Sequence, residues 1–376
     1  MESKPFGEAP LLPLAVSMMV GIVIGWYVQM PFPLWPVLAG GVVIALLLRR
    51  WAMWQSVAIV VSFVVLGALL MQMERAEVSE AERSMTRVER SRHWFLEQRA
   101  QLLKRLETHG VEGEAYSVVA AMALGDKSTL TKDLRDTYAA TGASHVLALS
   151  GLHLGIIYTL LSLVLARRRW QVLSQLLILT AVWAFVFLVG MTVSVVRAAV
   201  MLSVYAMLSL GRRDRMSVNT LAFTAMVMLA FEPSWLFDIG FQLSFVAVFF
   251  ILLFLPLLEN AGWVWTMTVV SCAAQLGTAP LVAYYFGRIS PWFLLTNFVV
   301  VPAATLIVWL SLVVLVVPSL APMLAWVATT LNRLLGMIAV LPGASVSGLH
   351  PSLLQVAMLY VAILSTYLLI FRRKGW

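Results

Sequence analysis

The chain has 376 residues, of which 61% are hydrophobic and only 12% are charged, whereas a soluble domain carries about 25% charged residues. This composition excludes an ordinary water-soluble fold, because so few polar residues cannot cover an apolar core of this size. The formal net charge of +8 would indicate an anionic partner in a soluble protein, but much of it falls in short loops between apolar runs. The single cysteine, Cys272, excludes an intrachain disulfide and a cysteine-based zinc site.

Apolar runs of about 20 residues, the length that a helix needs to cross a bilayer, recur along the chain. The runs are continuous rather than alternating, so helices are expected and a β-barrel is excluded. The predicted fold is all-α: a polytopic integral membrane helical bundle of about 12 spans, with short external amphipathic helices. The run at 320–341 contains Asn332 and Arg333 and could be re-entrant. The expected span cores are residues 11–29, 33–48, 56–72, 145–165, 172–190, 193–210, 217–231, 240–257, 263–283, 293–316, 320–341 and 353–371.

The first apolar run is preceded by acidic as well as basic residues, which favours an uncleaved span over a signal peptide. Residues 1–72 form an N-terminal region of three expected spans. At 73–111, Arg, Lys and Glu alternate, which predicts an external charged helical connector. Under the positive-inside rule, the basic clusters place both chain termini in the cytoplasm. These clusters are Arg49–Arg50, Arg167–Arg169, Arg212, Arg213 and Arg215, and Arg372–Lys374.

Residues 112–144 predict two short amphipathic helices at the outer surface, which we call the collar. Glycine suits the end of the first helix, and an Asp-Lys-Ser sequence after it is typical of a turn. A threonine is expected to cap the second helix, and a Thr-Gly pair ends it. The residues that mark these ends and the turn are Gly125, Asp126, Lys127, Thr131 and Gly142.

His145, Ser150 and His153 lie on one predicted helix that begins after the collar. Ser150 and His153 are three residues apart and therefore neighbours on its surface, and an intramembrane serine hydrolase would need such a pair. Hydrogen-bonded Ser and His more often join helices in membrane bundles, and no acidic or oxyanion motif accompanies them. Neither histidine stands in an H-E-x-x-H pattern, so no zinc site is expected. Gly151 and Gly155 form a small-xxx-small face, which predicts a close helix contact.

Ionisable residues inside spans are functional candidates, because a charge at the bilayer centre costs about 2.5–3.5 kcal/mol on insertion scales. Arg197 lies about one turn inside its expected span, and Asp238 lies just before another, both near the outer face. The two could pair with each other, or Arg197 could face an anion that passes through the protein. Uncharged polar residues in or beside spans could line a wet path or bridge helices; these are Gln242, Gln275 and Asn297.

Several blocks of this sequence, in this order, resemble those of the ComEC-type competence proteins. The resemblance implies a multi-pass channel of the bacterial inner membrane that carries single-stranded DNA into the cytoplasm during natural transformation, with no enzymatic activity of its own. It covers residues 112–310. The blocks are ALGDKSTL at 123–130, TGASHVLALSGLHLG at 141–155, and the segments 189–213, 219–245 and 273–290.

Members of that family often add an external OB-like domain and a metallo-β-lactamase-like domain, and neither is evident here. The five histidines contain no H-x-H-x-D-H pattern, and residues 73–111 are too short for an OB barrel. We therefore expect either a short form of the family or a truncated chain, with a competence-type channel domain at 112–310 and C-terminal spans at 311–376. The partners implied by the resemblance are single-stranded DNA, the lipid bilayer, an external DNA receptor, a separate nuclease or OB-domain protein, and a cytoplasmic helicase-like motor.

Two alternatives to a DNA channel remain open: the serine hydrolase built on Ser150 and His153, and a small-solute transporter or assembly scaffold. Under the channel hypothesis no catalytic residue, cofactor or metal ligand is expected. The candidate DNA-path or channel-structure residues are Asp126, Lys127, Gly142, His145, Ser150, His153, Arg197, Asp238, Gln242, Gln275 and Asn297.

Overall fold

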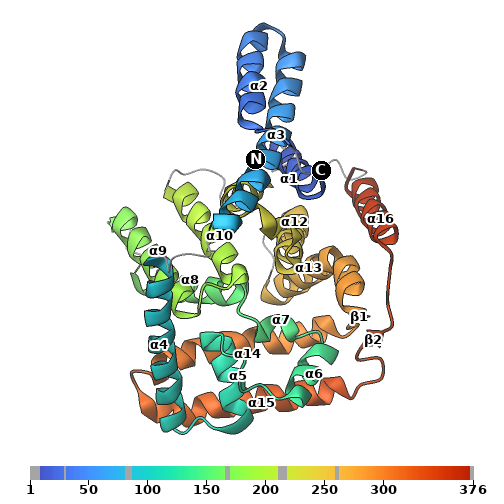
Figure 1. The fold of residues 1–376 in the computed structure, drawn as a ribbon. Helices are drawn as coiled ribbons and strands as arrows, with labels where there is room; N and C mark the ends of the chain where they lie inside the picture. The colour runs from blue at the N-terminus through green and yellow to red at the C-terminus, as the bar shows by residue number, and fades with distance from the viewer. Residues whose placement is uncertain are drawn as a thin grey trace.

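The computed structural model describes residues 9–28, 31–80, 87–165, 170–210, 218–258 and 262–372. These residues are almost entirely helical, as predicted, with one small two-stranded sheet among them (Figure 1). The helices are α1 Leu11–Tyr27, α2 Trp35–Leu47, α3 Ala52–Glu80, α4 Arg87–Thr108, α5 Gly113–Leu124, α6 Lys132–Ala140, α7 Ser144–Leu147, α8 Gly151–Leu165, α9 Gln171–Leu188, α10 Val193–Leu210, α11 Val218–Phe231, α12 Ile239–Phe254, α13 Trp263–Phe286, α14 Phe293–Val314, α15 Ala321–Ala339 and α16 Leu353–Arg372.

Six described helices are long and apolar enough to cross a bilayer: α3, α9, α12 with the short helical turn that follows it, α13, α14 and α16. This agrees with the prediction of an all-α membrane protein. The shorter apolar helices α1, α5, α8, α10 and α11 have 10–17 described residues each, fewer than the roughly 20 of an ordinary span. The predicted count of about 12 spans is therefore not confirmed.

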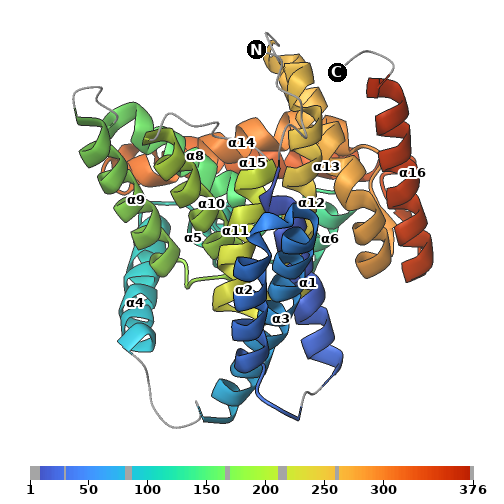
Figure 2. The same cartoon turned by 90° about the horizontal axis from the view of Figure 1, so that it is seen from above.

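The helices α14 and α15 pack together and cross the molecule in both views, crosswise to α16 (Figure 1, Figure 2). Spanning helices tilt by about 20° on average, so helices that lie crosswise cannot both stand along the bilayer normal. Of this pair only α14 is a candidate span, and α15 exposes Arg333. The expected spans at 293–316 and 320–341 therefore do not run parallel to the one at 353–371.

The first helix of the predicted collar is not at the surface. The residues of α5 from Val118 to Met122 are completely covered, because α4, α14 and α15 pack around this helix. The prediction of an amphipathic surface helix is wrong for α5, since helices distant in sequence cover the face that was expected to meet water. The second helix, α6, is amphipathic as predicted, and its buried Tyr138 donates a hydrogen bond from the hydroxyl to Asn332 Oδ1 on α15 at 2.9 Å.

The described end of the charged connector is part of the same core. Leu103 and Leu106 of α4 are buried beside α5, and Phe95 stacks on Phe187 of α9 with 5.5 Å between ring centroids. One apolar core thus includes the end of α4, the collar region, α14 and α15.

At the C-terminus, α16 is held by two tyrosine hydroxyls. Tyr360 donates to the carbonyl of Gly277 in α13 at 2.7 Å, and Tyr367 donates to the carbonyl of Leu253 in α12 at 2.8 Å. Strand β1, Arg288–Ile289, pairs antiparallel with β2, Val346–Ser347. The end of α13 and the segment before α16 are therefore joined, and they position the loop that carries Ser290.

Candidate functional site

The turn between α5 and α6 has the local structure that its sequence predicts. Gly125 has a φ of 73° and ends α5, and Asp126 Oδ1 accepts a hydrogen bond from the backbone N–H of Ser128 at 3.0 Å. The side chain of Thr131 caps α6. Gly125 packs on Leu149, because a Cβ built on it would lie 2.5 Å from Leu149 Cδ1. The turn therefore lies beside the segment that joins α7 to α8.

The turn after α6 depends on Gly142. Its φ of 81° is in a region that residues with a side chain rarely adopt, and a Cβ built there would lie 3.1 Å from Ser290 Cβ. The Nδ1 atom of His145 lies 3.0 Å from the Gly142 carbonyl oxygen, which requires Nδ1–H to donate. Gly142 and His145 are exposed. The turn is therefore accessible at these two residues and also contacts the loop after α13.

The helix predicted at 145–165 is interrupted. It ends as α7 at Leu147, the backbone is extended at Ala148, and α8 begins at Gly151. His145 is therefore on a different helix from His153, contrary to the prediction. The interruption is stabilised locally, because the freed backbone N–H of Ser150 donates to a side chain within the next turn, as described below.

The contact between Ser150 and His153 is a helix cap. His153 Nδ1 lies 3.1 Å from Ser150 Oγ and accepts the backbone N–H of Ser150 at 3.3 Å, as Glu does in a capping box. The remaining ring proton is then on Nε2, which is buried and has no hydrogen-bond partner among the described residues. A serine hydrolase needs a third group that orients the histidine, and no described residue supplies one.

The expected small-residue contact on α8 is only partly present. A Cβ on Gly151 would lie 3.6 Å from Ala198 Cβ of α10, an ordinary contact, and a Cβ on Gly155 would meet nothing within 4 Å. The prediction of a close contact is therefore wrong at Gly155. Gly151 nevertheless brings the start of α8, which is exposed there, against α10.

Arg197 of α10 pairs with Asp238 at the start of α12, as the sequence suggested it could. Its side chain is 2% exposed, and Nη1 donates to Asp238 Oδ1 at 2.9 Å. The same Oδ1 accepts the backbone N–H of Phe241 at 2.7 Å, so Asp238 also caps α12. Gly240 leaves room for the guanidinium, since a Cβ there would lie 3.0 Å from Nη2. The charge of Arg197 is thus neutralised inside the protein, while the Asp238 side chain is 41% exposed.

The three uncharged candidates differ in their surroundings. Gln242 bridges helices: its Oε1 accepts the hydroxyl of Tyr285 on α13 at 2.6 Å, and its Nε2 donates to the Leu236 carbonyl at 3.0 Å. Gln275 on α13 and Asn297 on α14 are half-buried. Neither of these two side chains makes a hydrogen bond within the described part of the chain.

These contacts close a circuit, which we call the contact ring. Gly151 joins α8 to α10, Arg197 joins α10 to α12, and Gln242 joins α12 to α13. The chain continues from α13 to Ser290, which meets Gly142, and from Gly142 through α7 back to α8. Figure 1 shows these elements arranged around the middle of the molecule. The ring includes or borders Gly142, His145, Ser150, His153, Arg197, Asp238 and Gln242.

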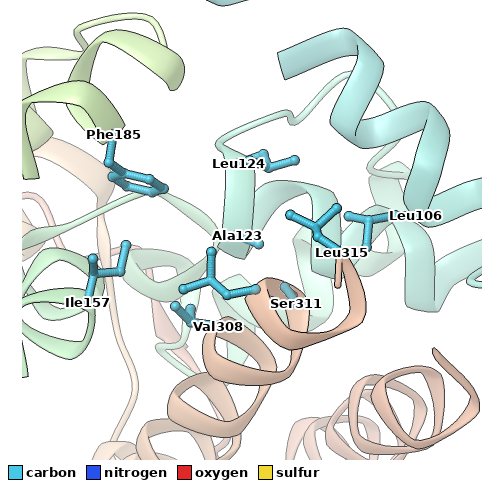
Figure 3. Close-up of a pocket in the computed structure, with 9 residues that line it drawn as sticks. Leu106, Ala123, Leu124, Ile157, Phe185, Val308, Ser311 and Leu315 are labelled. Carbon is cyan, nitrogen blue, oxygen red and sulfur yellow. The ribbon is translucent and has the colours of Figure 1, made fainter. Parts of the chain in front are cut away.

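A separate pocket lies outside the contact ring, between α4, α5, α8, α9 and α14 (Figure 3). Its walls are almost entirely apolar, with Phe185, Leu124 and Val308 among them and Ser311 as a polar exception. Its volume of about 20 Å³ accommodates little more than one water molecule. A pocket this small and apolar does not suit a polar substrate.

Sequence reasoning did not predict the ring contacts of three residues. Gly240 had a usable signal, because a glycine in the first turn of an apolar helix leaves room for a neighbouring group. Tyr285 and Ser290 had none, since their roles depend on partners 43 and 148 residues away, Gln242 and Gly142.

Comparison with known proteins identifies the class of this helical membrane protein. The model of the competence protein family matches residues 122–373. The chain belongs to this family, as the sequence blocks suggested, and the match extends through α16 rather than ending near residue 310.

Two relatives are informative. ComE operon protein 3 of Bacillus subtilis (strain 168) is 32% identical over 198 residues, which cover 51% of this chain and 25% of that protein. An uncharacterized protein of Aquifex aeolicus (strain VF5) is 36% identical over 159 residues, which cover 42% of this chain and 38% of that protein. The chain thus aligns with less than half of either relative. No solved structure matches it.

Proposed function

We propose that the chain forms a channel of the bacterial inner membrane through which single-stranded DNA enters the cytoplasm during natural transformation. One observation carries the proposal: every contact of the ring lies between Gly142 and Ser290, inside the segment 122–373 that matches the competence family. The ring joins elements from four separate parts of that segment, which is the arrangement expected of a site built by the family's shared fold.

The chemistry of the ring suits a path for a polyanion. Such a path must be hydrated and must bind weakly enough to release the strand. His145, Gly142 and Gly151 are exposed on the ring, while the Arg197 cation is neutralised by Asp238. We infer that the strand meets polar backbone and neutral side chains here rather than a row of free cations, and that the ring widens during passage.

We propose that partner proteins make DNA movement through the channel unidirectional. Its sequence contains no P-loop, so it has no recognisable means of using a nucleotide for transport. We propose a cytoplasmic helicase-like motor, an external DNA receptor and a separate nuclease or OB-domain protein.

Both chain termini are proposed to be cytoplasmic, with the connector and the collar on the outer side. In a variant whose Cys272 is replaced by Ser, a cysteine in place of the exposed Lys104 of α4 should react with a membrane-impermeant maleimide added from outside. A cysteine in place of the exposed Arg50 should react only after the membrane is opened. The opposite labelling pattern would contradict this topology.

Transport itself can be tested with liposomes that contain the purified protein and an entrapped complementary strand. A fluorescent single-stranded oligonucleotide added outside should hybridise inside, giving a signal that empty liposomes do not give. Passage of small solutes without the oligonucleotide would support a small-solute transporter and contradict the DNA channel.

Gly142→Val should insert normally and reduce oligonucleotide uptake at least tenfold, because the new side chain meets Ser290 and disturbs the ring. Gly110→Val is the matched control: Gly110 also has a positive φ of 90° but has nothing within 4 Å of its Cβ position. If Gly142→Val and Gly110→Val reduce oligonucleotide uptake equally, backbone strain alone explains the reduction, and the contact between Gly142 and Ser290 has no role.

A further inference from the structure

Helix α15 has an exposed apolar stripe on the face opposite its buried one. The buried face, with Leu324, Leu331 and Leu335, belongs to the core that α15 shares with α5 and α14. The large apolar residues of the exposed stripe, each with its exposed fraction, are Met323 (50%), Trp326 (67%), Met337 (60%) and, at the C-cap, Val340 (83%). Successive members are three or eleven residues apart, which keeps them on one side of a helix.

One cation lies within this stripe. Arg333 is exposed, and it follows Trp326 by seven residues and precedes Met337 by four, so it is on the same face of the helix. It forms no ion pair with the described residues. Tryptophan collects at the level of lipid headgroups, and arginine extends its charge from an apolar surface toward water or phosphate. The stripe therefore has the composition of a surface at the boundary between lipid and water.

The direction of α15 does not suit a spanning helix. Its 19 residues are long enough to cross a bilayer, yet it is not one of the candidate spans, whereas α16 is. The two helices run crosswise in both views (Figure 1, Figure 2). Because spanning helices tilt by only about 20° on average, α16 as a span places α15 along the plane of the bilayer.

The neighbours of α15 indicate its depth. Helix α6 packs on α15 and is joined to it by the hydrogen bond from Tyr138 to Asn332. Charged side chains are costly at the bilayer centre, so α6, and α15 with it, must lie close to water. The exposed charged residues of α6 and of the turn before it are Lys127, Lys132, Asp133, Arg135 and Asp136.

The apolar exposure extends beyond α15. Val316 and Val317 are exposed in the segment that joins α14 to α15, and Leu306 and Leu312 are exposed on α14. A partner protein usually covers one bounded patch, whereas this exposure runs over two helices and their connection. Lipid surrounds a membrane protein on every apolar side, so lipid is the occupant that this surface fits.

We infer that α15 lies in the interfacial layer of the bilayer, parallel to the membrane plane and on the side that carries α6. The stripe contacts the upper part of the lipid acyl chains, and Arg333 pairs with a lipid phosphate. The partner of this surface is therefore a phospholipid layer, and an interfacial helix replaces the expected span at 320–341. This inference does not depend on transport of DNA.

The test measures the depth of three spin labels along α15. In the full chain with Cys272→Ser, the changes Met323→Cys, Thr330→Cys and Met337→Cys are made and labelled one at a time in nanodiscs that contain phosphatidylglycerol. Collisions with oxygen, which concentrates in lipid, and with a water-soluble nickel chelate report the depth of each label. Neighbouring positions are about 10 Å apart along a helix axis. All three labels should nevertheless lie at one depth, within about 5–10 Å of the headgroup boundary.

Helix α16 supplies the matched control. Leu354, Val361 and Leu368 have the same seven-residue spacing and are exposed, and α16 is a candidate span. A label at Val361 should therefore be much deeper than labels at the other two positions. The same pattern on α15, with Thr330 deeper than both ends, would mean that α15 spans the bilayer and would overturn the inference. Labels on α15 that meet the chelate as freely as in water, or that protein shields from both reagents, would overturn the contact with lipid.

The role of Arg333 is tested by charge reversal. Arg333→Glu should move the label at Met337 several ångströms toward water, because a carboxylate is repelled by lipid phosphate, and Arg333→Gln should move it less in the same direction. Arg288→Glu makes the same change at an exposed residue of β1 and should leave the label in place. Thermal unfolding identifies variants that still fold. An equal label depth in the Arg333→Glu and Arg288→Glu variants would overturn the pairing of Arg333 with phosphate.

Discussion

Alanine in place of Gly67 should separate α3 from α1 and unfold the N-terminal helix pair. The two backbones touch at this point: an added Cβ would overlap the carbonyl oxygen of Met18 and lie 2.9 Å from the backbone nitrogen of Ile22. Neither backbone atom can move aside as a flexible side chain would. Overpacking typically costs about 1–3 kcal/mol, and a clash between helix backbones belongs at or above the upper end of that range.

The measurement is thermal unfolding of the purified protein in detergent, together with its abundance in membranes. Gly40→Ala in α2 is the matched control, because a Cβ at Gly40 meets nothing within 4 Å and alanine is the better helix former by about 1 kcal/mol. Gly67→Ala should lower the unfolding temperature and Gly40→Ala should not. Equal stability of the two variants would mean that α1 and α3 do not approach as closely as described.

The same small-residue pattern occurs twice in the sequence with different results. Gly21 and Gly25 are four residues apart on α1, and both face α3 closely. Gly151 and Gly155 have the same spacing on α8, yet Gly155 faces open space. The spacing permits a close helix contact, but the whole fold determines whether another helix packs there. Spacing alone therefore predicted the contact at Gly151 and Gly155 and not the one at Gly21 and Gly25.

Local features of the site were predictable because their causes are local. The end of α5 at Gly125, the cap by Thr131 and the turn at Gly142 each depend on a few neighbouring residues, and all three are present. The interruption between α7 and α8 was missed, because Ala148 and Leu149 are compatible with a helix. The only sequence signal was the serine at the new N-cap, which was interpreted as a surface neighbour of His153.

Burial was less predictable than helix position. Helix α5 reads as amphipathic, yet α14 and α15 cover it from almost 200 residues further along the chain. The orientation of α14 was equally hidden, because an apolar helix of 22 residues has the composition of a span whether or not it stands along the bilayer normal. Amino-acid composition indicates whether a helix prefers lipid or water, but it does not indicate how the helix is oriented in the bilayer.

The pair formed by Arg197 and Asp238 was predictable as a possibility, since a buried arginine requires an anion. The sequence left two anions open, Asp238 and a DNA phosphate. The structure pairs Arg197 with Asp238 and leaves its Nε without a hydrogen-bond partner among the described residues. Because the guanidinium is buried, we expect Arg197 to position α10 against α12 rather than to touch the strand.

Arg197→Gln should therefore reduce the amount of folded protein in the membrane, and the loss of DNA uptake should follow that reduction. Removing one partner of a buried ion pair costs about 3–5 kcal/mol, and the exposure of Asp238 places this pair toward the lower value. Arg197→Lys should recover part of the folded protein, because it keeps the charge but loses the second donor that binds Ser194 Oγ at 3.2 Å.

Asp238→Asn separates the two roles of Asp238, since asparagine caps a helix as well as aspartate does but cannot neutralise Arg197. Asp238→Asn should be destabilised like Arg197→Gln. The double variant should be destabilised by less than the sum of the two single changes, because it removes both charges and leaves neither without its partner. Normal abundance of Arg197→Gln with abolished uptake would instead assign Arg197 to the strand. Normal abundance with full uptake would exclude both roles, and uptake measured beside membrane abundance distinguishes the three outcomes.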